Sequence, residues 1–233
     1  MSHAGELLAR LNPRGVNYLG VPSGAPELTT SDIAGALAFV PKGLGRTVLE
    51  AVYWPDGACR TRELRNAVHG LVMPELTRQL YRLQEAELDL QLTQAAVHWS
   101  RTGITYEQQL EIDRARNRLE SIREKTWPRN TLEHLPQIVK AIISELSCAV
   151  KCPSCSGRGE IERNDIPRQC DNCKASGYLF YSDRGRASLI NCDHALYLRR
   201  WKIVYVWIFD KLLDAKYQAS RHFENALYRT VPS

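Results

Sequence analysis

The sequence predicts a mostly α-helical protein, in which a small four-cysteine module is inserted between a helical body and a C-terminal helix-turn-helix that ends in a long helix. Three observations carry this prediction. Apolar residues recur every three to four positions through much of residues 31–150, which is the spacing of amphipathic helices. Two Cys-x2-Cys pairs then follow in a polar stretch, and the helical spacing returns over residues 198–227.

The bulk composition is that of a globular chain. Of the 233 residues, 44% are hydrophobic and 24% are charged, as in ordinary folded domains. The most apolar stretch, Val204 to Phe209, is far shorter than the roughly 18–20 residues that span a bilayer. The N-terminus also has no apolar signal-peptide core. We therefore expect a cytoplasmic protein without a membrane partner, in which paired cysteines bind metal rather than form disulfides.

The first fifty residues predict an arm and two short helices. Residues 1–30 are rich in glycine and proline and show no apolar period, which indicates a flexible arm. A first helix is expected at 33–39, capped by Ser31 or Asp32, and a second at 46–53.

The next segment allows two interpretations. A helix at 61–68, a second helix opening at Pro74 and an alternating apolar pattern at 88–92 make a winged helix possible within residues 47–99. Its arginines would then face nucleic acid: Arg60, Arg62, Arg65, Arg78 and Arg82. The alternative, an ordinary helical core with solvated arginines, is preferred.

The middle of the chain has the clearest helical pattern. Over residues 107–125 the apolar positions follow a 3-4-3 spacing and the other faces are charged, which predicts an amphipathic helix that packs on the body or pairs with a partner. A further apolar helix is expected at 135–150, and it leads directly to the first paired cysteine. These helices complete the body, residues 31–150.

The four-cysteine module is expected at residues 151–182. Two Cys-x2-Cys pairs separated by 14 residues can close a tetrahedron of thiolates around Zn²⁺. The ligands would be Cys152, Cys155, Cys170 and Cys173. Gly157, Gly159 and Gly177 supply the positive-φ conformations that a tight metal knuckle needs. We expect a zinc-ribbon-like module with one structural zinc ion, because four thiolates leave no open coordination position.

Two alternatives stay open at this site. An iron–sulfur cluster also takes four cysteines, although the glycine-rich knuckles favour a single ion. Cys148 and Cys192 lie close enough in sequence to assist as ligands, and the other interpretation is that they are ordinary thiols in helices. The polar segment between the pairs cannot form a core, so the metal would supply its folding free energy, on the order of 10 kcal/mol or more.

The C-terminal region, residues 183–233, has the pattern of a helix-turn-helix. A short strand at 178–181 leads to a helix at 184–191, and after a connection a long helix opens at Leu198. In a helix-turn-helix the second helix enters the major groove of DNA. The candidates for base and phosphate contacts are Arg184, Arg186, Arg199, Arg200 and Lys202. The alternative is that these side chains are solvated on a structural pair of helices.

The net charge of +5 lies entirely in the C-terminal third. Residues 1–150 hold 17 Lys and Arg and 17 Asp and Glu, whereas residues 151–233 hold 14 and 9. A basic region beside a metal module indicates a polyanionic partner, and the alternative is a solvated basic surface.

Taken together, these motifs resemble the late-gene antitermination proteins of the Q family from lambdoid phages. The resemblance rests on Cys-x2-Cys-x-Gly-x-Gly followed by Cys-x2-Cys-x3-Gly over residues 152–177, and more weakly on Ser31-Asp32-Ile33-Ala34. Its third element is the C-terminal pattern of Trp201, Asp210, Leu212, Asn225 and Leu227. The segment around residues 60–130 departs from the family's pattern.

The resemblance implies a transcription factor without catalysis. Proteins of this family bind a DNA element at the late promoter, load onto paused RNA polymerase holoenzyme that still carries its sigma factor, and suppress pausing and termination. Carried over, the four cysteines would hold zinc and the helix that opens at Arg199 would read double-stranded promoter DNA.

Two other functions are kept as alternatives. The first is a zinc-containing DNA-binding regulator without a polymerase contact. The second is a chaperone-type zinc module, since the first cysteine motif also occurs in the DnaJ cochaperones, although this chain has two knuckles rather than four and lacks their His-Pro-Asp tripeptide. An enzyme is not expected, because the six histidines are scattered and the chain has no phosphate-binding glycine loop.

Overall fold

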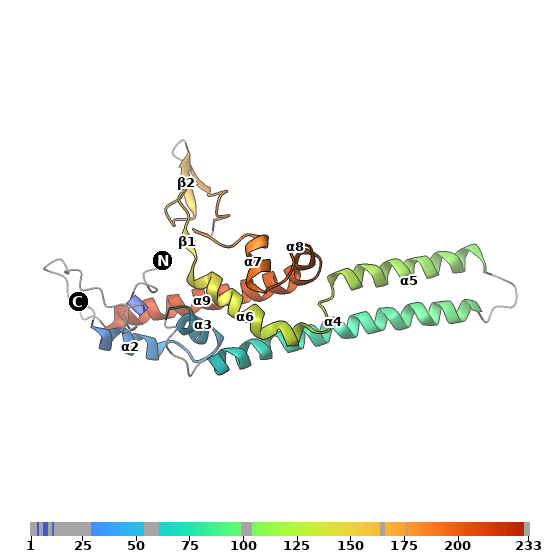
Figure 1. Ribbon diagram of the computed structural model, residues 1–233, viewed down its shortest axis with the longest axis horizontal. Coiled ribbons are helices and arrows are strands. Elements are labelled where there is room, and N and C mark those ends of the chain that lie inside the picture. Colours follow the sequence, from blue (N-terminus) through green and yellow to red (C-terminus); the bar gives the residue numbers. More distant parts are fainter. Residues whose placement is uncertain are drawn as a thin grey trace.

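The computed structural model describes residues 29–53, 61–98, 104–163, 166–175 and 177–230, together with residues 4, 7, 8 and 11. Helices dominate, and a small module with four clustered cysteines projects from one side of them (Figure 1). The mostly helical fold class is therefore confirmed. Within the described ranges, no helix is both long enough and apolar enough to cross a membrane.

The body is organised around the C-terminal helix α9 (Lys202–Thr230). Helices α3 (Leu44–Tyr53) and α6 (Thr131–Ser147) lie against it, and one buried apolar cluster joins all three to the first half of α4 (Thr61–His98). Fully buried members of this cluster include Val48, Val68, Val72, Ile142, Ile208 and Leu212. Each such side chain stabilises the fold by about 1.5–3 kcal/mol relative to an exposed position, so burial holds the body together.

A second apolar cluster lies at the other end of α9. It joins α2 (Thr30–Phe39) to α9 through contacts that include Ile33 and Phe223. Thr29 caps α2 with a capping box, because its hydroxyl accepts from the Asp32 N–H while the Asp32 carboxylate accepts from the Thr29 N–H. The helix predicted here is confirmed, although it begins and is capped slightly earlier than the sequence indicated.

Most of the arm predicted at residues 1–30 lies outside the described residues, and so does Arg60. Within the arm, Ala4, Leu7 and Leu8 are described, and all three are buried in the second apolar cluster. These three residues therefore belong to the core of the body.

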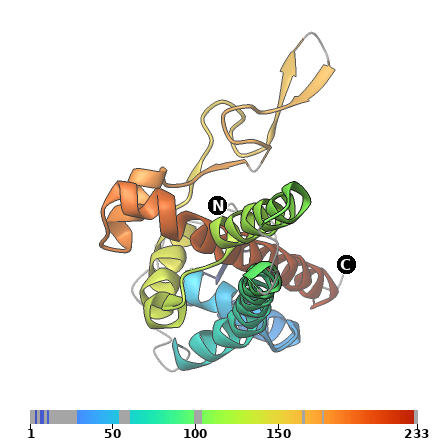
Figure 2. The same cartoon turned by 90° about the vertical axis from the view of Figure 1, so that its right-hand side faces the viewer.

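Helices α4 and α5 (Tyr106–Lys125) form an antiparallel hairpin that extends beyond the body (Figures 1 and 2). Helix α4 has 38 residues, which corresponds to a length of about 57 Å. A narrow apolar seam that includes Leu83, Ala86 and Leu119 joins the two helices. Exposed ion pairs link the hairpin at two further places, Arg118 with Asp89 and Arg123 with Glu87. The predicted amphipathic helix is thus confirmed, and it pairs with α4.

The strand predicted at 88–92 is wrong, because residues 61–98 are helical throughout. Alternating leucines favoured a strand, but in the helix Leu90 packs toward α5 whereas Leu88 and Leu92 are exposed. A run of five residues is too short to distinguish a period of two from a period of 3.6. The strand that a winged helix would need is therefore absent from residues 61–98.

The separate helix predicted to open at Pro74 is also wrong, since α4 continues through this residue. Proline has no N–H to donate to the carbonyl of Gly70, which normally weakens a helix. Both residues lie on the exposed face, where water can bond to the free carbonyl. On the opposite face Val72 and Leu76 are buried, and their packing keeps the helix continuous.

The four-cysteine module leaves the body between α6 and α7 through a short two-stranded stem. In this stem β1 (Val150–Lys151) pairs antiparallel with β4 (Tyr178–Leu179). A second antiparallel pair, β2 (Glu160–Arg163) with β3 (Ile166–Gln169), extends farther out. Figure 2 shows these strands rising away from the helices. The four cysteines form the module's buried cluster, with Ile161 and Leu179 packed against it, so its apolar core is very small.

The chain leaves the stem into a series of short helices. These are α7 (Asp183–Leu189), α8 (His194–Leu196) and a π-helical turn (Tyr197–Trp201) that runs into α9. Ser182 caps α7 and Asp193 caps α8 through their side-chain oxygens. The long helical stretch predicted from residue 198 therefore begins earlier, at α8.

Candidate metal centre

Four cysteine side chains meet inside the module. Their Sγ atoms lie within 4.8 Å of one another, and all four residues are buried. The Sγ atoms of Cys152 and Cys170 are 3.8 Å apart, and those of Cys155 and Cys173 are 3.7 Å apart. All four are free thiols rather than halves of disulfides. The cluster offers one sulfur ligand from each residue and can therefore hold a metal ion, as the spacing predicted.

Each Cys-x2-Cys knuckle is held by the other. The Cys152 N–H donates to the Gly177 carbonyl and the Cys170 N–H donates to the Gly159 carbonyl, both at 2.9 Å. A glycine N–H also approaches the second sulfur of each knuckle at 3.3 Å, from Gly159 to Cys155 and from Gly177 to Cys173. The second knuckle thus repeats the first, and its N–H groups can stabilise negative charge on sulfur.

Both knuckles require backbone in the left-handed region. Gly159 and Gly177 have φ values of 78° and 75°, and a Cβ at either position would collide with a carbonyl of the opposite knuckle. Ser156, Lys174 and Ala175 also adopt positive φ, at 53°, 49° and 65°. Residues with a Cβ hold such conformations only where the surroundings fix them, so the knuckles are under local strain.

Four thiolates packed this closely would repel one another, so they would need a compensating cation. Burial raises the pKa of the Cys173 thiol to about 11, and the neighbouring thiols act in the same direction. Burial also opposes ionisation of Cys152, but hydrogen bonds from the N–H groups of Cys155 and Ser154 lower its pKa to about 6. Burial therefore opposes ionisation at both of these sulfurs, whereas a bound metal ion would stabilise all four thiolates together.

Cys148 and Cys192 do not join this cluster. Cys148 is exposed at the end of α6, and Cys192 lies in the turn before α8, where burial raises the pKa of its thiol. In the described part of the chain, the four clustered cysteines form the only group of three or more possible metal ligands. Both are therefore thiols outside the cluster, although neither lies within a helix as the alternative interpretation expected.

Four of the five side chains predicted to contact DNA are exposed: Arg184 in α7, and Arg199, Arg200 and Lys202 near the start of the second helix. The Lys202 Nζ atom lies 2.7 Å from the Asp183 carboxylate, and the Arg200 Nη2 atom donates to Asn130 Oδ1 at 3.0 Å. Exposed pairs of this kind contribute at most about 1 kcal/mol, so these cations can exchange their partners for a phosphate.

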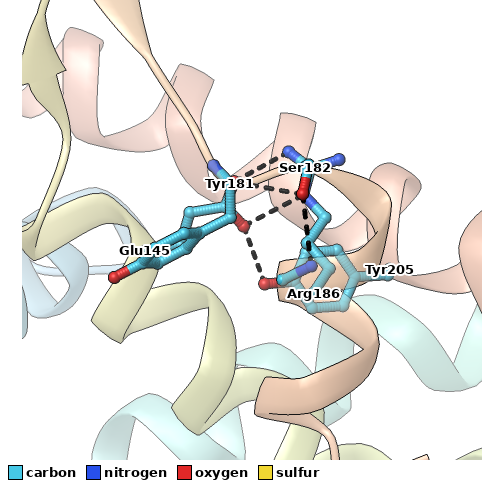
Figure 3. A network of polar contacts seen from close by, with 6 residues as sticks. Glu145, Tyr181, Ser182, Arg186 and Tyr205 are labelled. Carbon is cyan, nitrogen blue, oxygen red and sulfur yellow. Dashed lines mark hydrogen bonds and ion pairs between the residues drawn. The ribbon is translucent and has the colours of Figure 1, made fainter. Parts of the chain in front are cut away.

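Arg186 requires a correction, because its side chain is used inside the fold (Figure 3). Its side chain is 14% exposed, and its guanidinium forms an ion pair with the buried Glu145 carboxylate, with Nη2 2.9 Å from Oε1. It also lies 4.9 Å from the ring centre of Phe209. Burial acts to lower the pKa of Arg186, but the Glu145 carboxylate outweighs this and raises it. We therefore remove Arg186 from the side chains predicted to contact DNA.

Two residues of this region were missed in the sequence. Asn172 directs its Nδ2 atom to Cys152 Sγ at 3.5 Å and to Ser154 Oγ at 3.1 Å, and its place between two paired cysteines was an available signal. Glu145 is an acidic residue within an otherwise apolar helical face, and that mismatch was the signal for a buried polar contact.

No family model, curated protein or solved structure matches the chain. What the centre does is therefore inferred from its geometry and from the sequence motifs.

Proposed function

We propose that the protein is a non-catalytic phage transcription antitermination factor. It would bind double-stranded promoter DNA through its C-terminal region and load onto the bacterial RNA polymerase holoenzyme, with its sigma factor, to suppress pausing and termination. The observation that carries this proposal is the continuity of the four-cysteine module with the basic surface. Strand β4 leaves the cysteine cluster, and the chain continues through α7 and α8 into the π-helical turn; α7 carries the exposed Arg184 and the turn carries the exposed Arg199 and Arg200.

The metal is proposed to be a single structural zinc ion. Tetrahedral zinc with Zn–S bonds of about 2.3 Å places its sulfurs about 3.8 Å apart. The Sγ–Sγ distances of 3.8 Å between Cys152 and Cys170 and 3.7 Å between Cys155 and Cys173 fit this geometry. A cluster of several irons would hold its thiolates farther apart than the 4.8 Å limit found here. Four protein ligands fill the coordination sphere, so the ion would have no open position for a substrate or water. Its role would be to stabilise a zinc-ribbon-like module.

The pair formed by α7 and α8 is proposed to act as a helix-turn-helix. Asn191 adopts φ of 52° in the turn between them, a conformation that glycine often provides in such turns. Asp193 then caps the second helix, which continues through the π-helical turn into α9. The first turns of that helix carry Arg199, Arg200 and Lys202, where cations can reach base edges and phosphates.

The C-terminal pattern shared with the Q family supports a common packing of α9. Trp201, Leu212 and Leu227 are all buried, so these three positions describe the core of the body. The polymerase contact rests on the resemblance as a whole, and the α4–α5 hairpin lies in the segment that departs from the family.

Transcription in vitro across a terminator tests this function. The template carries a lambdoid late promoter, and the reaction contains RNA polymerase holoenzyme with or without the zinc-loaded protein. We expect readthrough to increase when the protein is present. Promoter binding without readthrough would favour the DNA-binding regulator, and neither binding nor readthrough would contradict both.

A charge-matched pair of variants tests the DNA surface. Arg199→Ala combined with Arg200→Ala should weaken promoter binding in a mobility-shift series and reduce the salt slope by about 0.9 for each phosphate that the protein no longer neutralises. The control, Arg114→Ala combined with Arg116→Ala, removes the same charge from exposed positions on α5. Equal weakening in both variants would show that net charge, and not this surface, determines the binding.

A further inference from the structure

One buried carboxylate lies where the four-cysteine module joins the body (Figure 3). Glu145, near the end of α6, is 1% exposed and accepts hydrogen bonds from three other segments. Arg186 of α7 donates from Nη2 at 2.9 Å and from Nε at 3.1 Å. The Tyr205 hydroxyl of α9 donates at 2.7 Å, and the backbone N–H of Tyr181 donates at 3.0 Å. These donors compensate the charge of Glu145. Without the carboxylate, the Arg186 guanidinium and the Tyr205 hydroxyl would lose their hydrogen-bond acceptor inside the fold.

The place of this carboxylate in the chain matters as much as its partners. Helix α6 leads into β1, the strand that enters the module, while Tyr181 follows β4, the strand that leaves it. Both strands of the stem are thus anchored near Glu145, one through the chain and the other through a hydrogen bond. The stem itself consists of two paired residues on each strand, and so short a pairing is not stable alone.

The same carboxylate also fixes the start of the proposed DNA-binding helices. Ser182, next to Tyr181, caps α7 by accepting from the Gly185 N–H. Arg186 lies in that helix, and its guanidinium packs over the rings of Tyr205 and Phe209 of α9, at 5.2 Å and 4.9 Å from their centres. A movement of Tyr181 away from Glu145 would therefore displace the first residues of α7.

We infer that Glu145, Tyr181, Arg186 and Tyr205 form a latch that couples metal binding in the four-cysteine module to the orientation of α7. The inference rests on the proposed zinc site and deepens the proposed DNA-binding function. Metal holds the two knuckles together and closes the stem, which keeps the Tyr181 N–H at the carboxylate. Coupling is reciprocal. If bound metal favours the closed latch by a certain factor, then the closed latch must raise the metal affinity by the same factor. Glu145 acts here as a positioning residue.

Zinc affinity of the full-length protein tests the latch without any DNA. Glu145→Gln keeps the side-chain size and removes the charge, and competition with a chromophoric chelator should show zinc binding weakened about tenfold, a factor usual for coupled sites. Tyr205→Phe removes one donor, keeps the ion pair and should weaken binding by a smaller factor. This second variant decides the matter if Glu145→Gln does not fold.

A matched variant separates coupling from general destabilisation. Val72→Ala lies in α4, is fully buried and is not a member of the latch. It should lower the thermal midpoint of the body without changing zinc affinity. Wild-type zinc affinity in Glu145→Gln and Tyr205→Phe, or an equal decrease in Val72→Ala, would overturn the latch.

Hydrogen exchange and DNA binding complete the test. Removing zinc from the wild type should speed amide exchange in α7 more than in α4, and Glu145→Gln should remove most of that difference. Unchanged exchange in α7 after zinc removal would contradict the coupling. A wild-type chain that binds zinc and shows the coupling but does not bind promoter DNA would contradict only the proposed function. A wild-type chain that takes up no zinc would contradict the metal proposal itself.

Discussion

The four-cysteine module and the helical body are held together by different forces. In the body, α3, α4, α6 and α9 share a large apolar cluster with many fully buried side chains. In the module, the buried cluster consists of four sulfurs with two partly buried apolar residues against them. The body can fold by burying apolar surface, whereas the proposed metal would have to supply the folding free energy of the module. The two regions should therefore fail under different treatments.

The largest effect is expected where a metal ligand is removed. Cys170→Ser should release the metal and unfold the module, since metal binding contributes on the order of 10 kcal/mol or more to such a fold. Metal analysis and amide hydrogen exchange check this, and the exchange of α4 and α5 should stay nearly unchanged. A folded module that lacks metal would contradict the comparison.

The opposite experiment removes apolar contacts from the body. Ile208 is fully buried in α9, and Ile208→Ala should lower the free energy of unfolding of the body by about 2–5 kcal/mol. Urea denaturation followed by tryptophan fluorescence measures this decrease. The metal content of the folded variant should match that of the wild type, and a folded variant that has lost its metal would show that the two regions are not independent.

A smaller effect is expected from the backbone of a knuckle. Gly159→Ala places a Cβ against the Ala175 carbonyl at a φ of 78°, and strain of this kind costs about 1–3 kcal/mol. Zinc affinity should fall while the thermal midpoint of the body changes little. The control is Gly70→Ala in α4, where a Cβ meets no atom within 4 Å and where alanine should stabilise the helix by about 0.5–1 kcal/mol.

The smallest effect is expected on the hairpin surface. Arg118→Ala removes an exposed ion pair of 3.4 Å with Asp89 and should change the free energy of unfolding by less than about 1 kcal/mol. The neighbouring Leu119→Ala removes a buried side chain from the seam and should cost more. Equal effects at these two positions would mean that charge, rather than apolar packing, joins α4 to α5.

The sequence predicted best what local spacing determines. Cysteine spacing identified all four members of the cluster, because each knuckle is a short turn whose geometry depends on few residues. The 3-4-3 pattern identified α5 for the same reason. Two predictions in α4 were wrong. Pro74 indicated the start of a separate helix and the leucines of residues 88–92 indicated a strand, but packing against α6 and α5 keeps the whole segment helical.

Side-chain partners that are distant in sequence could not be predicted. Arg186 looked like its exposed neighbours in a basic segment, yet a carboxylate 41 residues earlier holds it inside the fold. Nothing in the local pattern distinguishes such an arginine from one that faces solvent. Only the tertiary arrangement of α6, α7 and α9 brings together the Glu145 carboxylate, the Arg186 guanidinium and the Tyr205 hydroxyl.

The α4–α5 hairpin affects how the protein moves through solution. The second half of α4, a helix of about 57 Å, projects beyond the body with α5, so a chain of 26.5 kDa has an elongated shape and a larger frictional coefficient than a sphere. Such a chain tumbles more slowly and leaves a gel-filtration column earlier than a sphere of equal mass. Elution volume alone would thus make a monomer resemble a dimer, and light scattering is the measurement that separates shape from mass.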